Sequence, residues 1–109
     1  MIRRAFRMSV NPGQRDEYAR RHQPIWQELA DTLRAHGVQT YSIFVDQDTN
    51  DLFAYVEFDS IERWEAVAAT DVCRRWWHHM RDVMPATDDG EPLSRTLTEV
   101  LPPPCSTSV

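Results

Sequence analysis

The sequence contains no lysine, and all 12 of its basic residues are arginine. Without lysine, the protein cannot form a Schiff base with a carbonyl substrate, anchor pyridoxal phosphate, or build a phosphate-loop lysine site. Only three glycines are present, Gly13, Gly37 and Gly90, and they lie too far apart to form a dinucleotide-binding or phosphate-binding loop. The two cysteines, Cys73 and Cys105, form no metal-binding or redox motif, which favours reduced thiols in the cytoplasm.

Excess positive charge and long apolar runs are also missing. The net charge of −5 argues against nucleic acid as a partner, because binding the phosphate backbone requires a basic surface. Three arginines among the first ten residues interrupt any signal-peptide core, and no apolar run is long enough for a membrane helix. We therefore expect a soluble cytoplasmic protein with one domain over residues 1–101, followed by a proline-started, disordered tail at 102–109.

The hydrophobic pattern of the remaining sequence alternates between strand and helix periods. Strands with apolar residues at every second position are predicted at 2–10, 38–46 and 51–58, with a weaker one at 93–101. A helix is predicted from Pro12 to His36, capped by Asn11 and ended by Gly37, and further helices follow the caps Ser60 and Thr70, the second reaching about Met84. The order βαββαβ predicts the α+β, ferredoxin-like fold, with the helices on one face of a four-stranded antiparallel sheet.

One face of such a sheet has no cover within a single chain. The residues expected on the sheet include Phe44, Phe53 and Tyr55, and large aromatic side chains are poorly suited to open solvent. We therefore predict a homodimer that packs through the sheets.

The first helix contains the strongest candidate for chemistry. Tyr18 and His22 are four residues apart and share a helical face, and Pro24 should kink or restart the helix directly after them. A histidine suits proton transfer near neutral pH, although a partly buried histidine with a purely structural partner fits the same pattern. Tyr41 lies on the strand face that meets the helices and could close on this pair.

A second aromatic cluster occurs in the last helix. Trp76 and Trp77 are adjacent and diverge by roughly 100° around the helix axis, so one indole must face a groove, an edge or a dimer contact. Indole faces suit the C–H surface of a sugar ring, and dimer packing suits them nearly as well. His78 and His79 also diverge, and no acidic or cysteine partner completes a metal site, so we predict none.

These stretches resemble the L-rhamnose mutarotase family from Met1 to about Val100. The resemblance is carried by Asn11-Pro12, Glu17-Tyr18, Arg21-His22, Pro24-Ile25-Trp26, residues 64–69, Ala69-Thr70-Asp71-Val72-Cys73-Arg74-Arg75-Trp76-Trp77 and Asp82-Val83-Met84-Pro85. The family usually ends in a strand with aromatic residues, whereas here Leu101 leads into three prolines.

The resemblance implies a dimeric α/β-barrel enzyme that interconverts the α and β anomers of L-rhamnose. It implies His22 as proton donor, and Tyr18, Tyr41, Trp76 and Trp77 as sugar contacts. Anomer exchange needs only ring opening and closure by acid and base, so we expect no cofactor.

Two other functions fit the residues alone. One is a cofactor-independent monooxygenase or haem-handling enzyme on the same kind of dimeric barrel, because such sites also combine histidine with tryptophan. The other is a non-catalytic, sugar-binding dimer. Periodicity and spacing do not choose among the three.

Overall fold

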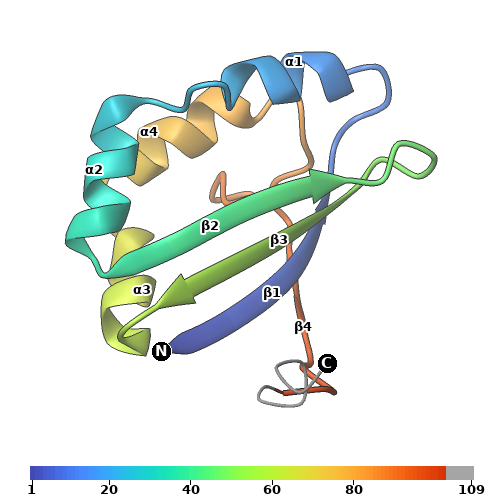
Figure 1. Ribbon diagram of the computed structural model, residues 1–109. Coiled ribbons are helices and arrows are strands. Elements are labelled where there is room, and N and C mark those ends of the chain that lie inside the picture. Colours follow the sequence, from blue (N-terminus) through green and yellow to red (C-terminus); the bar gives the residue numbers. More distant parts are fainter. Residues whose placement is uncertain (103–109) are drawn as a thin grey trace.

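The computed structural model describes residues 1–102 and forms a sheet covered by helices (Figure 1). The elements follow the predicted order, and the first predicted helix is divided into two. In chain order they are β1 (Ile2–Ser9), α1 (Arg15–Arg21), α2 (Gln27–Ala35), β2 (Val38–Val45), β3 (Asp51–Phe58), α3 (Ile61–Val67), α4 (Asp71–Met80) and β4 (Arg95–Leu97).

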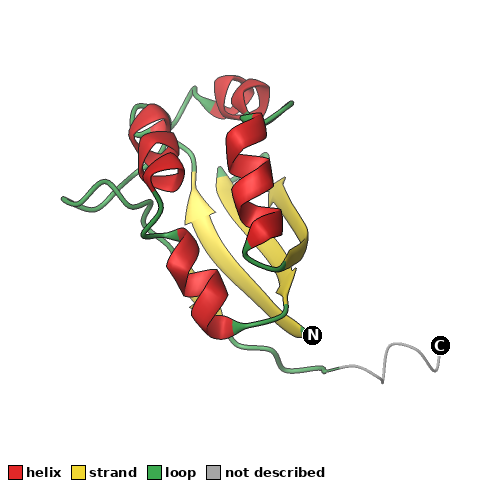
Figure 2. Ribbon diagram, turned by 90° about the vertical axis from the view of Figure 1, so that its left-hand side faces the viewer, coloured by secondary structure: helices red, strands yellow, loops and turns green. Residues whose placement is uncertain are grey.

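Within the described residues, the four strands form one antiparallel sheet in the order β2-β3-β1-β4. The two central strands pair along their whole length, from Ile2 opposite Phe58 to Ser9 opposite Asp51. The helices all lie on one face of the sheet (Figure 2). This arrangement confirms the ferredoxin-like α+β prediction.

The core lies between the helices and the inner face of the sheet. Leu52, Ala54, Val56 and Phe58 alternate along β3 on this face and are at most 2% exposed. Four residues of α4 are buried at helical spacing, as its sequence predicts: Val72, Cys73, Trp76 and Met80. Three of them, Val72, Trp76 and Met80, pack in one cluster with Leu52. Burial of this apolar surface is the main force that fastens the helices to the sheet.

The opposite face of the sheet has no helix over it within residues 1–102. Phe44 is 65% exposed and Phe53, its neighbour on β3, is 39% exposed. Arg7 of β1 lies opposite Phe53 on the other side. The outer face of the sheet, which was expected to lack cover within one chain, is therefore exposed in this chain.

The predicted break in the first helix occurs where Pro24 stands. α1 ends at Arg21 and α2 begins at Gln27, with a cis peptide bond between Gln23 and Pro24. The proline ring has no N–H to donate and would clash with the carbonyl four residues earlier in a continuous helix.

The predicted start of that helix is wrong. Asn11 does not cap a helix; its carbonyl accepts a turn hydrogen bond from the Gln14 N–H at 3.0 Å. The reason is Gly13, whose φ of +79° is incompatible with a right-handed helix. α1 therefore starts three residues after Pro12, at Arg15.

Two later elements, α4 and β4, are also shorter than predicted. α4 ends at Met80 instead of about Met84, because the following peptide groups bond elsewhere: the Val83 carbonyl accepts from the Asn11 N–H at 2.8 Å. β4 covers only Arg95–Leu97 of the predicted 93–101, because Leu93 instead donates its N–H to the Pro85 carbonyl. The predicted tail, apart from Pro102, lies outside the described residues.

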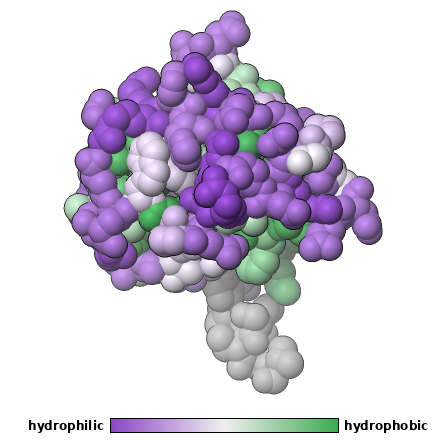
Figure 3. Space-filling view, turned by 90° about the horizontal axis from the view of Figure 1, so that it is seen from above, coloured by the Kyte–Doolittle hydropathy of each residue, from purple (hydrophilic) through white to green (hydrophobic). Residues whose placement is uncertain are grey.

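The outer surface of the helices is polar. Seen from above α1, it is mostly hydrophilic, and hydrophobic side chains show only in small separate areas (Figure 3). Among residues 1–102, no helix has both the length and the apolar composition needed to cross a membrane.

We predict that Gly37→Ala destabilises the fold more than Gly13→Ala. Both glycines have positive φ, which costs an alanine about 1–2 kcal/mol. A methyl group on Gly37 would also lie 2.0 Å from Oδ1 of Asp59, whose other carboxylate oxygen, Oδ2, accepts a hydrogen bond from Arg63 at 2.9 Å. No atom lies within 4 Å of the same position on Gly13. Urea unfolding of the two variants measures the difference, and equal losses would contradict the assigned contact.

Candidate active site

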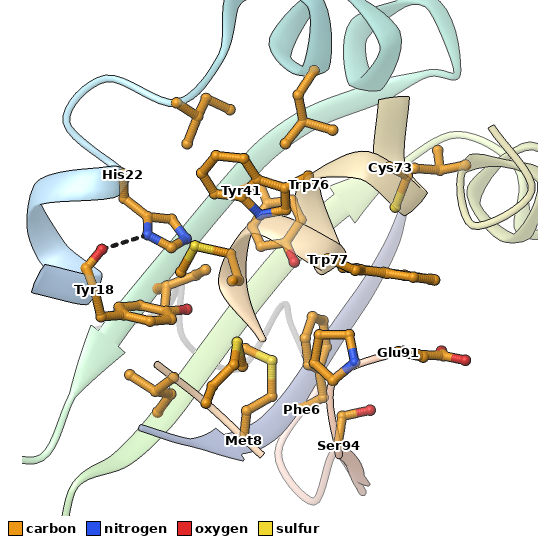
Figure 4. A pocket seen from close by; sticks show the side chains of 18 of the residues that line it. Phe6, Met8, Tyr18, His22, Tyr41, Cys73, Trp76, Trp77, Glu91 and Ser94 are labelled. Atoms are coloured by element: carbon orange, nitrogen blue, oxygen red, sulfur yellow. Dashed lines mark hydrogen bonds between the residues drawn. The ribbon is translucent and has the colours of Figure 1, made fainter. Parts of the chain in front are cut away.

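A cavity of about 850 Å³ lies between the helices and the inner face of the sheet. Its volume is within the usual range for small-molecule sites. All five residues singled out in the sequence line it, and they come from three different elements and a turn: Tyr18, His22, Tyr41, Trp76 and Trp77. Figure 4 shows their rings directed towards a common space.

His22 occupies the first position after α1, where the chain leaves the helix. Its ring nitrogen Nδ1 lies 2.8 Å from the backbone carbonyl oxygen of Tyr18. A carbonyl only accepts hydrogen bonds, so Nδ1 carries the proton in the neutral ring and Nε2 has the free lone pair. The second nitrogen points into the cavity (Figure 4), so Nε2 is the atom available to a ligand.

The surroundings of His22 disfavour its charged form. Burial of the half-buried ring lowers its pKa below the ordinary value, and the hydrogen bond to the Tyr18 carbonyl partly opposes this effect. Neutral imidazole therefore predominates at neutral pH, and the protonated form is a stronger acid than an ordinary imidazolium.

Aromatic contacts connect His22 to both of its neighbouring elements. Tyr18 stacks on the imidazole with ring centroids 4.3 Å apart, and Trp76 meets it edge-on at 5.3 Å. Trp26, at the start of α2, in turn meets Trp76 at 5.1 Å. The ring of His22 is thus held between α1 and α4, with Tyr18 on one side and Trp76 on the other.

Tyr41 reaches the same cavity from β2. Its ring centroid lies 6.2 Å from that of Phe6 and 5.9 Å from that of Trp64. The residue is 37% exposed, yet burial raises the pKa of its phenol above the usual range. Both observations agree if the exposed surface faces the cavity, which Tyr41 lines. Burial raises the pKa of Tyr18 as well, so both phenols stay protonated near neutral pH.

The two adjacent tryptophans have different environments. Trp76 is only 8% exposed and belongs to the core. Trp77 is half-buried and lies between the main cavity and a smaller groove of about 360 Å³ that also contains His78. The prediction that one indole must face a groove therefore applies to Trp77.

The remaining histidines of α4 do not join the imidazole of His22. His79 is exposed and packs against Trp26, with the two ring centroids 5.2 Å apart. In the part of the chain that the structure describes, no group of three histidine, cysteine, aspartate or glutamate residues is placed to hold a metal ion.

Some cavity residues carried no functional signal in the sequence. Glu91 and Ser94 line the cavity from the irregular segment before β4, where no periodicity indicates which side chains turn inward. The position of Arg4 could be read from the sequence, because Arg4 alternates with Phe6 and Met8 on the inner face of β1. All three residues line the cavity. Cys73 also lines it, and burial raises the pKa of its thiol to about 11, so the thiol is protonated at neutral pH.

Comparison with known proteins identifies the family of the chain. Residues 3–101 match the family model described as L-rhamnose mutarotase. The chain belongs to the L-rhamnose mutarotase family. It is 59% identical over 100 residues to the L-rhamnose mutarotase of Salmonella dublin, an alignment that covers 92% of this chain and 96% of the relative.

Solved structures of relatives extend the comparison to three dimensions. The crystal structure of L-rhamnose mutarotase FA22100 from Formosa agariphila has a TM-score of 0.84 at 38% identity, covering 93% of this chain and 97% of that one. The crystal structure of an antibiotic biosynthesis monooxygenase has a TM-score of 0.62 at 16% identity, covering 93% of this chain and 100% of that one. The second likeness shows only that the mutarotase family shares its ferredoxin-like fold with such proteins.

We predict that the stability of the protein depends on the protonation of His22. Because burial lowers the pKa of this ring, the unfolded chain binds the proton more tightly than the folded one between the two pKa values. The free energy of unfolding should therefore fall as the pH falls from about 6.5 and level off below the folded-state pKa. Urea unfolding over about pH 5–8 measures this slope.

The matched control for this prediction is His22→Asn. This variant lacks the titrating ring, so its free energy of unfolding should depend less on pH across the same range. An identical slope in both proteins would show that another group is responsible.

Proposed function

We propose that this protein interconverts the α and β anomers of L-rhamnose, as an isomerase that opens and closes the pyranose ring and supports rhamnose metabolism. The observation that carries the proposal is the imidazole of His22, held between Tyr18 and Trp76 with Nε2 directed into the cavity. Membership of the L-rhamnose mutarotase family supports the choice of substrate.

The reaction requires two proton transfers in each direction. In ring opening, protonated His22 gives its Nε2 proton to the ring oxygen, the bond from that oxygen to C1 breaks, and the anomeric hydroxyl loses its proton. Rotation about the C1–C2 bond of the resulting aldehyde turns its other face towards the oxygen. In closure, neutral His22 takes back the proton while the new anomeric oxygen gains one.

The second proton must pass through water or a phenol. Because burial keeps Tyr18 and Tyr41 protonated, each phenol is suited to relay a proton or to donate a hydrogen bond, and unsuited to act as a phenolate base. No electron transfer occurs and no bond to the protein forms, so the reaction uses no cofactor.

The aromatic residues supply the binding surface. The half-buried indole of Trp77 and the ring of Trp76 both line the cavity and offer apolar surface for the C–H groups of the sugar. Tyr18 and Tyr41 approach from α1 and β2, and their phenols are placed to orient the sugar hydroxyls. The uncatalysed reaction is already accessible in water, so one positioned acid–base group, which gives about 10²–10⁴-fold, suffices.

We predict that His22→Asn lowers the rate of anomer exchange by about 10²–10⁴-fold, because it removes the proton-transferring group. Saturation-transfer NMR between the anomeric protons of L-rhamnose measures the exchange directly. The matched control is His78→Asn on α4, which changes an exposed histidine outside the main cavity and should leave the rate unchanged. Undiminished exchange in a folded His22→Asn variant would exclude His22.

The same samples test the two other functions. Oxygen consumption with a quinol, or uptake of haem, without anomer exchange would favour a monooxygenase or haem-handling enzyme. A change in tryptophan fluorescence on adding L-rhamnose, again without exchange, would favour a sugar-binding protein. The structural likeness to monooxygenases concerns the fold and does not by itself favour the first.

The uncovered sheet face supports the proposal of a homodimer. Phe44, Phe53 and Tyr55 project from this face, and a second copy of the chain would remove them from water. We also propose a cytoplasmic location, which the buried thiol of Cys73 fits because thiols stay reduced there.

We predict that Phe44→Glu converts the dimer to a monomer, because a carboxylate at this position would have to be buried in the interface without a partner. Size-exclusion chromatography with light scattering measures the mass. Ile61→Glu is the control, since Ile61 is 42% exposed but lies on α3, away from the outer face of the sheet. A monomeric wild-type protein, or an unchanged mass in Phe44→Glu, would contradict the proposed interface.

A further inference from the structure

Arg21, the last residue of α1, has the least exposed side chain of the ion-paired arginines in the described residues. Its side chain is 12% exposed, whereas those of the others range from 28% to 71%. It directly precedes His22, and the reaction proposed above gives it no part. Arg21 is therefore an enclosed, charged neighbour of the imidazole, and its hydrogen-bond partners show which elements it connects.

The guanidinium of Arg21 joins the end of α1 to the end of α4. Its two Nη atoms donate to the two carboxylate oxygens of Asp82 at 2.8 and 3.1 Å. The first of them also donates to the backbone carbonyl of His79 at 2.7 Å, in the last turn of α4. Carbonyls in the last turn of a helix lack partners within the helix, so this bond caps α4.

The remaining donor of Arg21 points back along its own helix. Nε donates to a carboxylate oxygen of Glu17 at 2.7 Å, one turn earlier. Asp82 lies in a fixed segment, because its carbonyl accepts from the Asn11 side chain at 3.4 Å and the adjacent Val83 carbonyl accepts from the Asn11 N–H at 2.8 Å. Arg21 therefore uses all three guanidinium nitrogens on partners that are themselves held, in a fork that lysine cannot reproduce.

Few other contacts fasten this end of α1. The helix has seven residues, and Tyr18 is its only buried one. After His22 the chain leaves the helix for the turn at Pro24. The edge-on contact of 5.3 Å between His22 and Trp76 crosses from the end of α1 to α4, so it depends on how these two elements are joined. The ion pair of Arg21 and Asp82 joins them.

We propose that Arg21 is a positioning residue for His22, and that its clamp on Asp82 and the His79 carbonyl sets the place of the imidazole relative to Trp76 and the bound sugar. This inference rests on the proposed function. Arg21 itself exchanges no proton with the substrate, because its guanidinium is turned away to Asp82, Glu17 and the end of α4.

The test compares Arg21→Met with Arg20→Met. Arg20 is the neighbouring arginine on the same helix and also pairs with Glu17. Its side chain is 71% exposed and, within residues 1–102, forms hydrogen bonds and ion pairs with Glu17 alone. We expect the maximal exchange rate of Arg21→Met to fall by about 10- to 100-fold, with a much smaller change in KM, because displacement of a catalytic group by about 1 Å costs this much. Arg20→Met should behave like the wild type.

Two further variants separate positioning from general stability. Arg21→Lys keeps the charge without the fork and should restore only part of the lost rate. Asp82→Asn removes the carboxylate partner and should lower the rate in the same way, while the double variant Arg21→Met/Asp82→Asn should lose little more than either alone. Circular dichroism and thermal unfolding identify the folded variants, and Asp82→Asn decides the matter if Arg21→Met does not fold.

A readout that needs no substrate completes the experiment. The ¹⁵N chemical shifts of the His22 ring report which nitrogen carries the proton and whether the hydrogen bond to the Tyr18 carbonyl persists. We expect these shifts to change in Arg21→Met and Asp82→Asn and to stay unchanged in Arg20→Met.

The outcomes distinguish this inference from the proposed function. A folded Arg21→Met variant with the exchange rate and His22 shifts of Arg20→Met overturns the positioning role, whatever the reaction. If the wild-type protein exchanges no anomers, the proposed function fails, and the His22 shifts alone decide whether Arg21 places the imidazole.

Discussion

The interruption of the helical region at Pro24 is the constraint on which the site depends. In a continuous helix, the backbone donors and acceptors around His22 would all be satisfied within the helix. The imidazole would then lie on an ordinary helical face. The proline prevents this, so α1 ends at Arg21 and the chain turns before α2. His22 thereby lies at a helix end facing α4, where stacking on Tyr18 and edge contact with Trp76 hold its ring.

The layered fold then determines what surrounds that ring. One face of the sheet carries the aliphatic residues of β3, which are buried beneath the helices. The aromatic residues come mainly from the helices and β2 and form the walls of the cavity above this floor. Burial against these aromatic rings disfavours a charged imidazole and charged phenolates, which lowers the pKa of His22 and raises those of Tyr18 and Tyr41. A reaction that moves protons between neutral oxygens is well matched to such surroundings.

Polar contacts have a different role in this protein. Most of the ion pairs involve helix residues with exposed side chains, and such pairs contribute little to stability individually. Arg21 differs because it is enclosed and bonds to a carbonyl and a carboxylate at the end of another helix. Its contribution is to the relative placement of α1 and α4, and hence of the two rings that meet between them.

The sequence by itself determined the elements and their order. Period-two and helical patterns, the caps Ser60 and Thr70 and the turn at Gly37 act through neighbouring residues, so they can be recognised without a structure. The ends of elements are predicted less well. The positive φ of Gly13 delays the start of α1, and the Val83 carbonyl bonds to the N–H of Asn11, which is remote in the sequence. Recognition of the family rested on residues that are adjacent in the chain, and the same holds for the pairing of Tyr18 with His22.

Only the tertiary structure decided how distant residues meet. It brought Tyr41 into the cavity beside Phe6 and Trp64, placed Glu91 and Ser94 in the cavity wall, and joined Arg21 to Asp82, 61 residues away. These contacts depend on the packing of helices on a sheet, which is governed by the burial of whole faces, and no local propensity encodes which side chains of two remote segments will then lie within bonding distance.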